Sequence, residues 1–258
     1  MEKSFEGMLR NKLQDLNLSN RFYFHDEATS TNDLAKEMIA DDFAHGTIII
    51  AKSQVKGRGT YGRSFFSKQG TGIYMSIIID VNEWHFKRSD LATIFTAVAA
   101  SEAIIKVTKK SPRNKWVNDL FLDGLKIGGI LTETILNSNM LVIGVGLNVS
   151  TKKEDFPENL QNVAGSLGID DDTDEIKVLL ITEIIRKMFF FSNISDFKEC
   201  LSLYRLRSLI LDQIVEVKIG NDLFAGYVLD INDYGQLVVR KESGEIVKLN
   251  CGEASIRV

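Results

Sequence analysis

The sequence predicts an α+β protein with a large N-terminal part and a small C-terminal β module. Up to about residue 210, segments with the three-to-four spacing of helices are interspersed with β-branched, strand-like segments. From Gln213 the pattern changes to short alternating runs separated by turn residues such as Asp233-Tyr234-Gly235. A chain of 258 residues can bury one full core and a second, smaller one. We therefore expect two domains, 1–210 and 211–258, the second built from five strands.

Composition and charge exclude several classes of protein. The 44% hydrophobic and 26% charged residues are ordinary for a globular chain, and a net charge of -4 argues against a general nucleic-acid binder. The two cysteines, Cys200 and Cys251, have neither a disulfide-framework nor a metal-ligand spacing, which fits a reduced intracellular compartment. Residues 1–20 carry acids and do not form a signal peptide. Polar residues interrupt the apolar run from Leu91, which predicts a buried helix rather than a membrane span.

The order of the segments gives the larger domain a mixture of helices and strands. Spacing and capping residues predict helices at 5–16, 34–45, 91–107, 175–192 and 196–209. Strand-like runs occupy 21–24, 47–51, 73–79 and 140–145, and Asp123-Gly124 is a hairpin-turn signal between the runs 115–120 and 126–133. The polar stretch 150–175, which includes the acidic run 170–172, is typical of a loop.

A loop rich in glycine and cations follows the strand at 47–51. Residues 54–63 read Gln-Val-Lys-Gly-Arg-Gly-Thr-Tyr-Gly-Arg, with three glycines and three cations. Backbone freedom combined with positive charge suits a loop that wraps an anion, although a solvated surface loop has the same composition. We expect this glycine loop to make few contacts of its own and to become ordered over a ligand.

Polar residues gather at the ends of several predicted elements, where sites are usually built. Ser30-Thr31-Asn32 can cap a helix or bind a ligand, and Asn118-Asp119 can form a turn or belong to a site. Trp116 can be a core aromatic or a site residue. Lys126, between apolar neighbours, either protects an edge strand against pairing with another strand or directs a positive charge into a cleft. Gly128-Gly129 inside a strand pattern predicts a bulge or close ligand approach.

Together these motifs resemble those of the biotin protein ligases, also called biotin–acetyl-CoA-carboxylase ligases. The resemblance covers residues from about 22 to 258 and is carried by motifs in one fixed order. They are Ser30-Thr31-Asn32, Gln54 before Gly57-Arg58-Gly59-Thr60-Tyr61-Gly62-Arg63, Lys115-Trp116-Val117-Asn118-Asp119-Leu120, Lys126-Ile127-Gly128-Gly129-Ile130-Leu131-Thr132-Glu133, Gly144-Val145-Gly146-Leu147-Asn148 and Gly252-Glu253-Ala254-Ser255-Ile256-Arg257.

This resemblance implies a fold and an activity. The fold would be a mixed central sheet with flanking helices, as in class II aminoacyl-tRNA synthetases and biotin synthetases, plus a small C-terminal SH3-like β-barrel. The enzyme would make biotinyl-5′-adenylate from biotin and MgATP and transfer biotin to one lysine of a biotin carboxyl carrier domain of acetyl-CoA or pyruvate carboxylase. A cytoplasmic location, no membrane partner and either a monomer or a homodimer would follow.

Residue roles follow from the resemblance in the same way. Lys126 and Arg58 would be catalytic, because cations must screen the approach of biotin's carboxylate to the α-phosphate. Asp119 would be the residue for Mg²⁺. Biotin would be bound by Ser30, Thr31, Asn32, Gln54, Gly57, Arg58, Trp116, Lys126 and Gly128. ATP would be bound by Arg58, Gly59, Thr60, Arg63, Phe65, Asn118, Asp119, Asn148 and Arg257.

Three positions depart from the family's usual residues, and the N-terminus is short. Thr60 stands where arginine is common, which removes a charge from the glycine loop. Val117 replaces a proline, and Phe65 stands where tryptophan is common but can still stack on adenine. Many bacterial relatives carry a helix-turn-helix domain before the Ser-Thr-Asn motif. The few residues before Arg21 are too short for one, so we expect a ligase that does not bind DNA.

Three other functions compete with this interpretation. A lipoate–protein ligase shares the fold and the adenylation chemistry, but Ser30-Thr31-Asn32 with Gln54 favours biotin. A non-catalytic biotin sensor would keep the pocket, and the presence of Lys126 and Asp119 argues against it. A free-standing interaction module built on the C-terminal strands would leave the first 200 residues unexplained.

Overall fold

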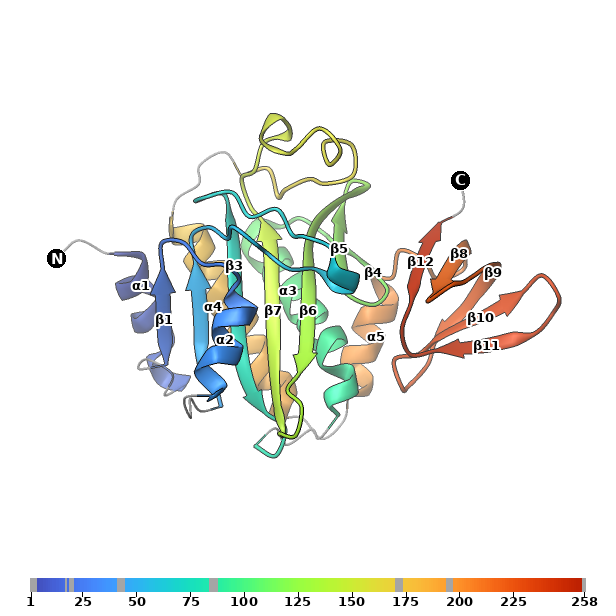
Figure 1. Ribbon diagram of the computed structural model, residues 1–258, viewed down its shortest axis with the longest axis horizontal. Helices are drawn as coiled ribbons and strands as arrows, with labels where there is room; N and C mark the ends of the chain where they lie inside the picture. The colour runs from blue at the N-terminus through green and yellow to red at the C-terminus, as the bar shows by residue number, and fades with distance from the viewer. Residues whose placement is uncertain are drawn as a thin grey trace.

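A computed structural model describes residues 4–16, 18, 21–40, 45–83, 88–169, 174–193 and 197–256 (Figure 1). Its larger sheet has the strand order β1-β2-β3-β7-β6-β5-β4, with β1 and β2 parallel and the other neighbours antiparallel. The predicted mixed central sheet is therefore confirmed. The strands are β1 (Phe22–His25), β2 (Ile48–Ala51), β3 (Gly72–Asp80), β4 (Arg113–Lys115), β5 (Asp119–Leu122), β6 (Leu125–Thr134) and β7 (Met140–Asn148).

Helices cover both faces of this sheet. Among the helices of the described residues, α2 packs on one face, and α3, α4 and α5 lie behind the other (Figure 1). The α-helices are α1 (Phe5–Lys12), α2 (Thr31–Ala40), α3 (Ala92–Thr108), α4 (Asp174–Asn193) and α5 (Lys198–Leu206); short 3₁₀ turns are η1 (Gln14–Leu16), η2 (Thr60–Gly62), η3 (Ser89–Leu91) and η4 (Lys153–Asp155). The last helix is shorter than the predicted 196–209, and the acidic run 170–172 lies outside the described residues. The helix α2 leaves much of this face to loops (Figure 1).

The helix α3 forms the centre of the hydrophobic core. The stretch Ser89–Thr108 is long and apolar enough to cross a membrane by length and composition, but 67% of it is buried inside the protein. Its hydroxyls are paired: Thr96 Oγ1 donates to the carbonyl of Ala92 at 2.8 Å, and Ser101 Oγ donates to Asn114 Oδ1 at 2.9 Å. The expectation of a buried core helix is therefore confirmed.

The C-terminal sheet is separate and wholly antiparallel, in the order β11-β10-β9-β8-β12. Its turns include Gly220, Gly235 and Gly244, each with φ between 56° and 88°, a conformation that glycine adopts without strain. The five predicted strands are thus present, and they match an SH3-like module. They are β8 (Ile214–Ile219), β9 (Asp222–Ile231), β10 (Leu237–Lys241), β11 (Ile246–Leu249) and β12 (Glu253–Ile256).

Trp116 anchors this module to the larger sheet. Its ring is only 3% exposed, and its indole N–H donates to the carbonyl of Gly235 at 2.9 Å. A backbone bridge between Asn114 and Ser208 holds the segment that leads into the module at the same β4 edge. In Figure 1 the module lies beside β4 and α5, so that β12 faces the glycine loop.

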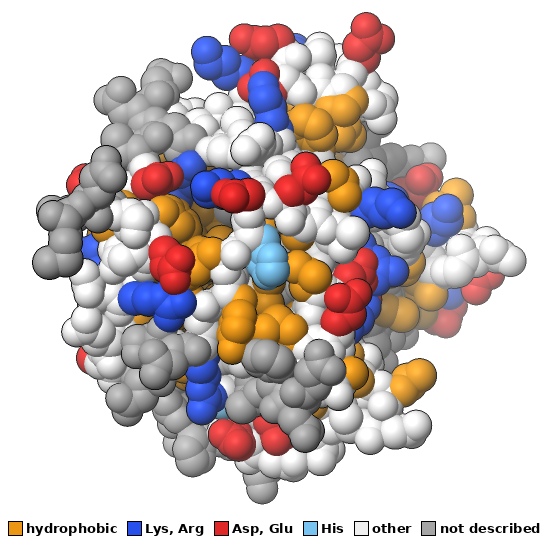
Figure 2. Space-filling model, turned by 60° about the vertical axis from the view of Figure 1, so that its left-hand side comes forward, with side chains coloured by type: hydrophobic (Ala, Val, Ile, Leu, Met, Phe, Trp, Pro, Cys, Tyr) orange, Lys and Arg blue, Asp and Glu red, His pale blue; other side chains and the backbone are white. Residues whose placement is uncertain are grey.

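Among the described residues, the opposite side of the molecule shows charges of both signs. Figure 2 brings the side with α1 and β1 forward, where acidic and basic side chains alternate around a group of hydrophobic side chains and a histidine. The strand β1 forms this edge of the sheet, and Arg10 covers part of it: its guanidinium donates to the carbonyl of Phe22 at 3.0 Å. A paired edge of this kind is protected against further strand addition.

Candidate active site

A small pocket, here called the polar pocket, lies where α2 begins. Gln54 Oε1 accepts hydrogen bonds from the backbone N–H of Thr31 at 2.8 Å and from its hydroxyl at 3.2 Å. Gln54 therefore satisfies a backbone donor that the start of a helix cannot pair by itself. The cavity measures about 30 Å³, room for about one water. Its walls are Ser30, Thr31, Asn32, Gln54, Arg58, Phe65, Met75, Gly129, Leu131, Gly144, Val145 and Gly146.

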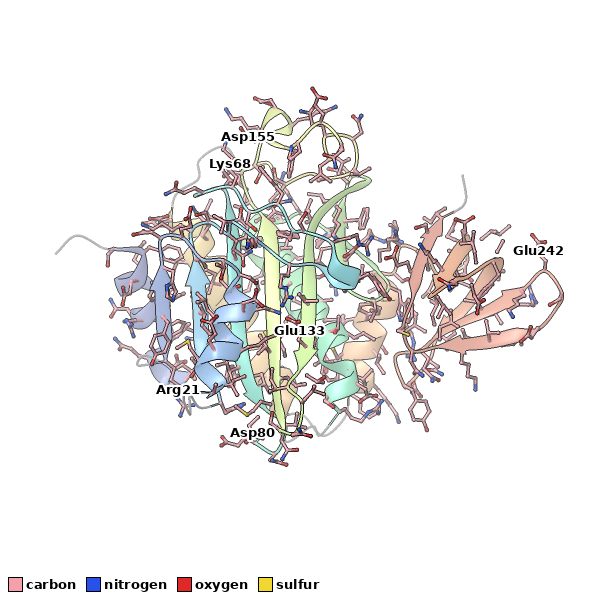
Figure 3. All side chains as sticks on the ribbon, viewed as in Figure 1. Arg21, Lys68, Asp80, Glu133, Asp155 and Glu242 are labelled. Carbon is pink, nitrogen blue, oxygen red and sulfur yellow. The ribbon has the colours of Figure 1, made fainter. Side chains whose placement is uncertain are left out.

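A buried network stands behind the polar pocket. The Ser76 hydroxyl lies 2.7 Å from Thr31 Oγ1 and 2.6 Å from Asn32 Oδ1, and Asn32 Nδ2 donates to Glu133 Oε2 at 2.8 Å. Lys36 donates to the other Glu133 oxygen at 2.6 Å. Figure 3 labels Glu133 on the sheet face beneath α2. Burial alone would raise the pKa of Glu133, but the bonds from Lys36 and Asn32 outweigh it and hold the pKa below its ordinary value.

Two glycines of β7 make the polar pocket sterically possible. Because side chains alternate along a strand, positions 144, 146 and 148 lie on the same face of the sheet. A Cβ on Gly144 would stand 2.3 Å from Asn32 Oδ1, and a Cβ on Gly146 would stand 2.6 Å from the Phe65 ring. The Gly-x-Gly-x-Asn motif therefore lets Asn32 and Phe65 lie flat against the sheet.

Arg58 extends from the glycine loop over the polar pocket. Its guanidinium donates to Asp33 Oδ1 at 2.6 Å and is 3.8 Å from Glu133 Oε1. The loop backbone also bonds to the segment before α2, since Lys56 N–H donates to the carbonyl of Thr29 at 2.8 Å. The expectation that this loop makes few contacts of its own is therefore wrong: backbone pairing, which composition does not reveal, holds it.

A second and larger space, here called the cleft, has a volume of about 450 Å³, which is the size of small-molecule sites. At its floor, Lys126 Nζ is 2.6 Å from Asp119 Oδ1. Further residues in its walls are Gly59, Thr60, Arg63, Ser64, Phe65, Phe66, Lys115, Asn118, Phe121, Gly124, Gly129, Asn148, Phe156, Leu160, Asn162, Val163 and Ala164.

A β-bulge places Lys126 in the cleft. Residues three apart on a regular strand face opposite sides of a sheet. The register shift between β5 and β6 pairs Phe121 with Lys126 and Asp119 with Gly129, so both β6 residues face the cleft. The Gly128-Gly129 pattern predicted a bulge or close ligand approach, and the bulge is present; Gly128 itself serves strand packing, since a Cβ there would stand 2.6 Å from the Gly146 carbonyl.

Phe65 and Gly129 border both the polar pocket and the cleft. A ligand that spans the two would pass between them. The Phe65 ring rests on Gly146 and meets Tyr74 edge-on, with the ring centroids 6.4 Å apart. The two spaces are therefore neighbouring parts of one site, divided by a single aromatic side chain.

The polar loop after β7 closes the far side of the cleft. Phe156 tilts against Phe66, with the ring centroids 5.5 Å apart. Lys68 pairs with Asp155 at 2.5 Å, and Figure 3 labels these two residues at its top. Asn148 Nδ2 donates to the carbonyl of Gly165 at 2.9 Å. Asn148 thus fixes this loop as well as facing the cleft.

The strand β12 of the C-terminal module reaches the mouth of the cleft. Glu253 pairs with Arg63 at 2.5 Å, and the Gly252 N–H donates to the Tyr61 hydroxyl at 3.0 Å. Lys115 Nζ donates to Ser255 Oγ at 3.2 Å. Both the glycine loop and β4 are therefore tied to the module.

The structure brings most of the predicted site residues together, with four exceptions. Trp116 lines neither space, because its ring is buried under the C-terminal module. Gly57 packs against the Phe65 carbonyl, where a Cβ would stand 2.4 Å away, and Gly128 faces the neighbouring strand. Both glycines serve close backbone packing. Arg257 lies outside the described residues.

Sequence reasoning assigned no role to several wall residues. Lys115 stands inside a motif that was recognised, and Phe66 follows Phe65 directly. Phe156 is an aromatic in an otherwise polar loop, which is a usable signal. Asp33 and Glu133 hold Arg58 only through the fold, and no spacing rule would pair them.

Comparison with known proteins identifies the class. Residues 25–149 match the family model of the Biotin/lipoate A/B protein ligase family, and residues 210–257 match that of the Biotin protein ligase C terminal domain. The first match thus defines the class as a ligase with a biotin- or lipoate-type catalytic domain. The second match is specific to one branch, and the chain belongs to the biotin protein ligase family.

Relatives extend this match along the chain. The bifunctional ligase/repressor BirA of Bacillus subtilis is 27% identical over 94% of this chain and 76% of its own length. The biotin--[acetyl-CoA-carboxylase] ligase of Mycobacterium tuberculosis is 28% identical over 87% of this chain and 84% of its own length. The biotin protein ligase of Aquifex aeolicus, solved with biotin and ATP, superimposes with a TM-score of 0.77 at 26% identity, covering 92% of this chain and 98% of that one.

Proposed function

We propose that this protein is a biotin–[acetyl-CoA-carboxylase] ligase that joins biotin to ATP as biotinyl-5′-adenylate and then transfers biotin to a lysine of a biotin carboxyl carrier domain. The observation that carries the proposal is the meeting of two unlike spaces at Phe65 and Gly129, one small and lined by hydrogen-bonding side chains, the other large and lined by Arg63, Lys115 and Lys126. The donors and acceptors of the first suit a neutral hydrogen-bonding head group once Phe65 or Arg58 has moved, and the cations of the second suit a nucleotide triphosphate. The ligase domain would be 1–210 and the module 211–258.

Biotin's ureido group needs both donors and acceptors, and the polar pocket offers them. The Thr31 hydroxyl, the Ser30 hydroxyl and Asn32 line it together with Gln54. Because these groups are already positioned by one another, their geometry would select a ureido head over a chain without one. The carboxylate of biotin would extend past Phe65 into the cleft.

The first reaction brings two anions together. The carboxylate oxygen attacks the α-phosphorus, the bond from that phosphorus to the bridging oxygen breaks, and pyrophosphate leaves with the electron pair. Arg58 on one side and Lys126 on the other would stabilise the charge on the phosphoryl oxygens. Both cations now rest on carboxylates, Asp33 and Asp119, which would be exchanged for the substrates.

Magnesium fits the donor set on the cleft floor. No group of three or more His, Cys, Asp or Glu that could hold a metal occurs in the described ranges. Mg²⁺ is commonly held by one or two carboxylates together with substrate phosphates, and Asp119 offers one such carboxylate, with Asn118 beside it. When bound, the ion would supply charge neutralisation to the phosphates.

The acceptor, the location and the remaining nucleotide contacts complete the proposal. Gly59, Thr60 and Arg63 from the glycine loop, Phe65 and Asn148 would surround the nucleotide. The acceptor would be a carrier domain of acetyl-CoA or pyruvate carboxylase, and the location would be the cytoplasm; the name of the Mycobacterium tuberculosis relative supports acetyl-CoA carboxylase as the acceptor. Lipoate is the alternative substrate, since the catalytic-domain model covers both ligase types; the C-terminal match favours biotin.

The decisive experiment compares Lys126→Ala with the parent protein. Biotin-dependent release of pyrophosphate from MgATP should fall by about 10²–10³-fold, the usual cost of removing one group that stabilises the transition state. Lys106→Ala is the matched control, because Lys106 pairs with Glu183 on the far face of the sheet. A parent protein that releases no pyrophosphate with biotin, or works only with lipoate, would overturn the proposal.

A further inference from the structure

Lys115 occupies an unusual place in the cleft. It ends the edge strand β4, opposite Asp119 in the register, and its side chain is half-buried. Its ammonium donates to Ser255 Oγ at 3.2 Å and lies 5.8 Å from the centre of the Phe121 ring. The cation therefore stands between the cleft floor and the C-terminal module.

The other two cations of the cleft have carboxylate partners. Lys126 rests on Asp119 at 2.6 Å and Arg63 on Glu253 at 2.5 Å. Within the described part of the chain, Lys115 has a neutral hydroxyl as its hydrogen-bond partner and no carboxylate within ion-pair distance. The positive charge of this half-buried ammonium is not balanced by a nearby negative charge. An anion that binds beside it therefore gains more binding free energy than it would beside a cation already paired with a carboxylate.

We propose that Lys115 binds the β- and γ-phosphates of ATP and retains the pyrophosphate that leaves, an assignment that rests on the proposed ligase function. Two features place the phosphates here. Lys126 and Lys115 flank Asp119 from β6 and β4, so a triphosphate with its α-phosphate at Lys126 reaches Lys115 with its far end. Arg63 lines the same wall and would join Lys115 once its bond to Glu253 is exchanged.

The C-terminal module takes part through Ser255. Its hydroxyl holds the ammonium at the cleft without neutralising it, whereas a carboxylate at the same position would compete with phosphate. The strand β12 thus orients one phosphate-binding cation with Ser255 and restrains another with Glu253.

A chemical footprint tests the assignment without any turnover. The unmodified protein is treated with a limiting amine-acylating reagent, and labelling of each lysine is measured by peptide mass spectrometry across a titration of sodium pyrophosphate. Labelling of Lys115 should fall severalfold with pyrophosphate or ATP and stay unchanged with AMP. Lys106, on α3, is the internal reference. Unchanged labelling of Lys115 at every pyrophosphate concentration would overturn the inference and leave the ligase function untouched.

Kinetics give the second test. Lys115→Met should raise the KM for ATP, and the KM for pyrophosphate in the reverse reaction, by about tenfold or more, the effect of one lost charged hydrogen bond. Biotin binding and transfer of biotin from preformed adenylate should not change, because neither involves pyrophosphate. Lys115→Arg should restore most of the affinity. Equal KM values in Lys115→Met and parent would refute the role, whereas a parent without biotin-dependent pyrophosphate release would refute the ligase function itself.

Discussion

The polar pocket and the cleft satisfy their polar groups in different ways. In the polar pocket, neutral side chains bond to one another: Gln54 to Thr31, and Ser76 to Thr31 and Asn32. In the cleft, the floor is an ion pair between Lys126 and Asp119. One space therefore presents a fixed arrangement of donors and acceptors, and the other presents charges whose partners can be exchanged.

This difference matches two kinds of recognition. A fixed hydrogen-bonding array discriminates against a ligand that leaves its buried groups unpaired. Exchangeable ion pairs give affinity for any polyanion of suitable size and leave the choice of ligand to shape. The polar pocket is also much smaller than the cleft, about 30 Å³ against about 450 Å³. A ligand of biotin's size can therefore enter the polar pocket only if Phe65 or Arg58 moves.

The largest expected effect comes from crowding the polar pocket. In Gly144→Ala the new Cβ would stand 2.3 Å from Asn32 Oδ1, so Asn32 must leave Ser76 or Glu133. We expect the free energy of unfolding to fall by about 1–3 kcal/mol, the range for overpacking, and biotin affinity to fall by at least about tenfold. Denaturant unfolding and calorimetric titration with biotin measure the two.

Gly59→Ala is the matched control for stability. Its nearest new contact, 3.4 Å from the Arg63 carbonyl, is an ordinary one, and its φ of -125° suits alanine. If Gly144→Ala unfolds at the same denaturant concentration as Gly59→Ala and binds biotin normally, the polar pocket is not the rigid array described above.

Most of the fold follows from the sequence, because it depends on local patterns. The β-branched run at 73–79 and the alternating tail from Gln213 became β3 and the five-stranded module. The Asp123-Gly124 turn has positive φ at both residues, 50° and 81°, as a two-residue hairpin requires. Each strand and turn here is determined by a short local pattern, so periodicity and turn chemistry suffice to predict it.

The site was predicted less completely, because its contacts join distant segments. Trp116 could be a core or a site residue by composition; only the docking of the C-terminal module onto β4 buries it. The tie between Arg63 and Glu253 spans 190 residues, and no local pattern contains it. Gly128-Gly129 indicated the bulge, but not which way Lys126 points. That direction follows only from the pairing of β5 with β6, whose register shift turns Lys126 toward the cleft.

A smaller effect concerns Glu133 and acid stability. Its pKa is lowered in the folded state, so its contribution is fully present above the unfolded value of about 4.5 and is lost as the pH falls through the lower folded value. Lys36, Asn32 and Arg58 face it with donors or positive charge. Glu133→Gln should therefore be less stable than the parent by about 1 kcal/mol at neutral pH, with the difference shrinking below pH ~4.5.

Urea unfolding curves recorded across this pH range check the Glu133 prediction. Asp26→Asn is the control, since it removes an exposed pair with Lys52 that lies outside the network. A constant difference between Glu133→Gln and the parent at every pH would mean that the carboxylate charge plays no part in holding the polar pocket.

The smallest expected effect is at Thr60, an uncharged residue of the glycine loop that lines the cleft. Its hydroxyl accepts a hydrogen bond from Arg63 at 3.2 Å, and the chain turns at Tyr61 with a φ of 57°. Thr60→Arg would add a cation beside the nucleotide. Because the loop is partly exposed, the gain should be at most about 1 kcal/mol, a few-fold slower loss of biotinyl-adenylate from the protein, and it should decrease with added salt. Rapid filtration of the protein loaded with labelled biotin and ATP measures this rate. Thr60→Gln has similar reach and no charge, so an equal slowing in both variants would assign the effect to contact area and not to charge.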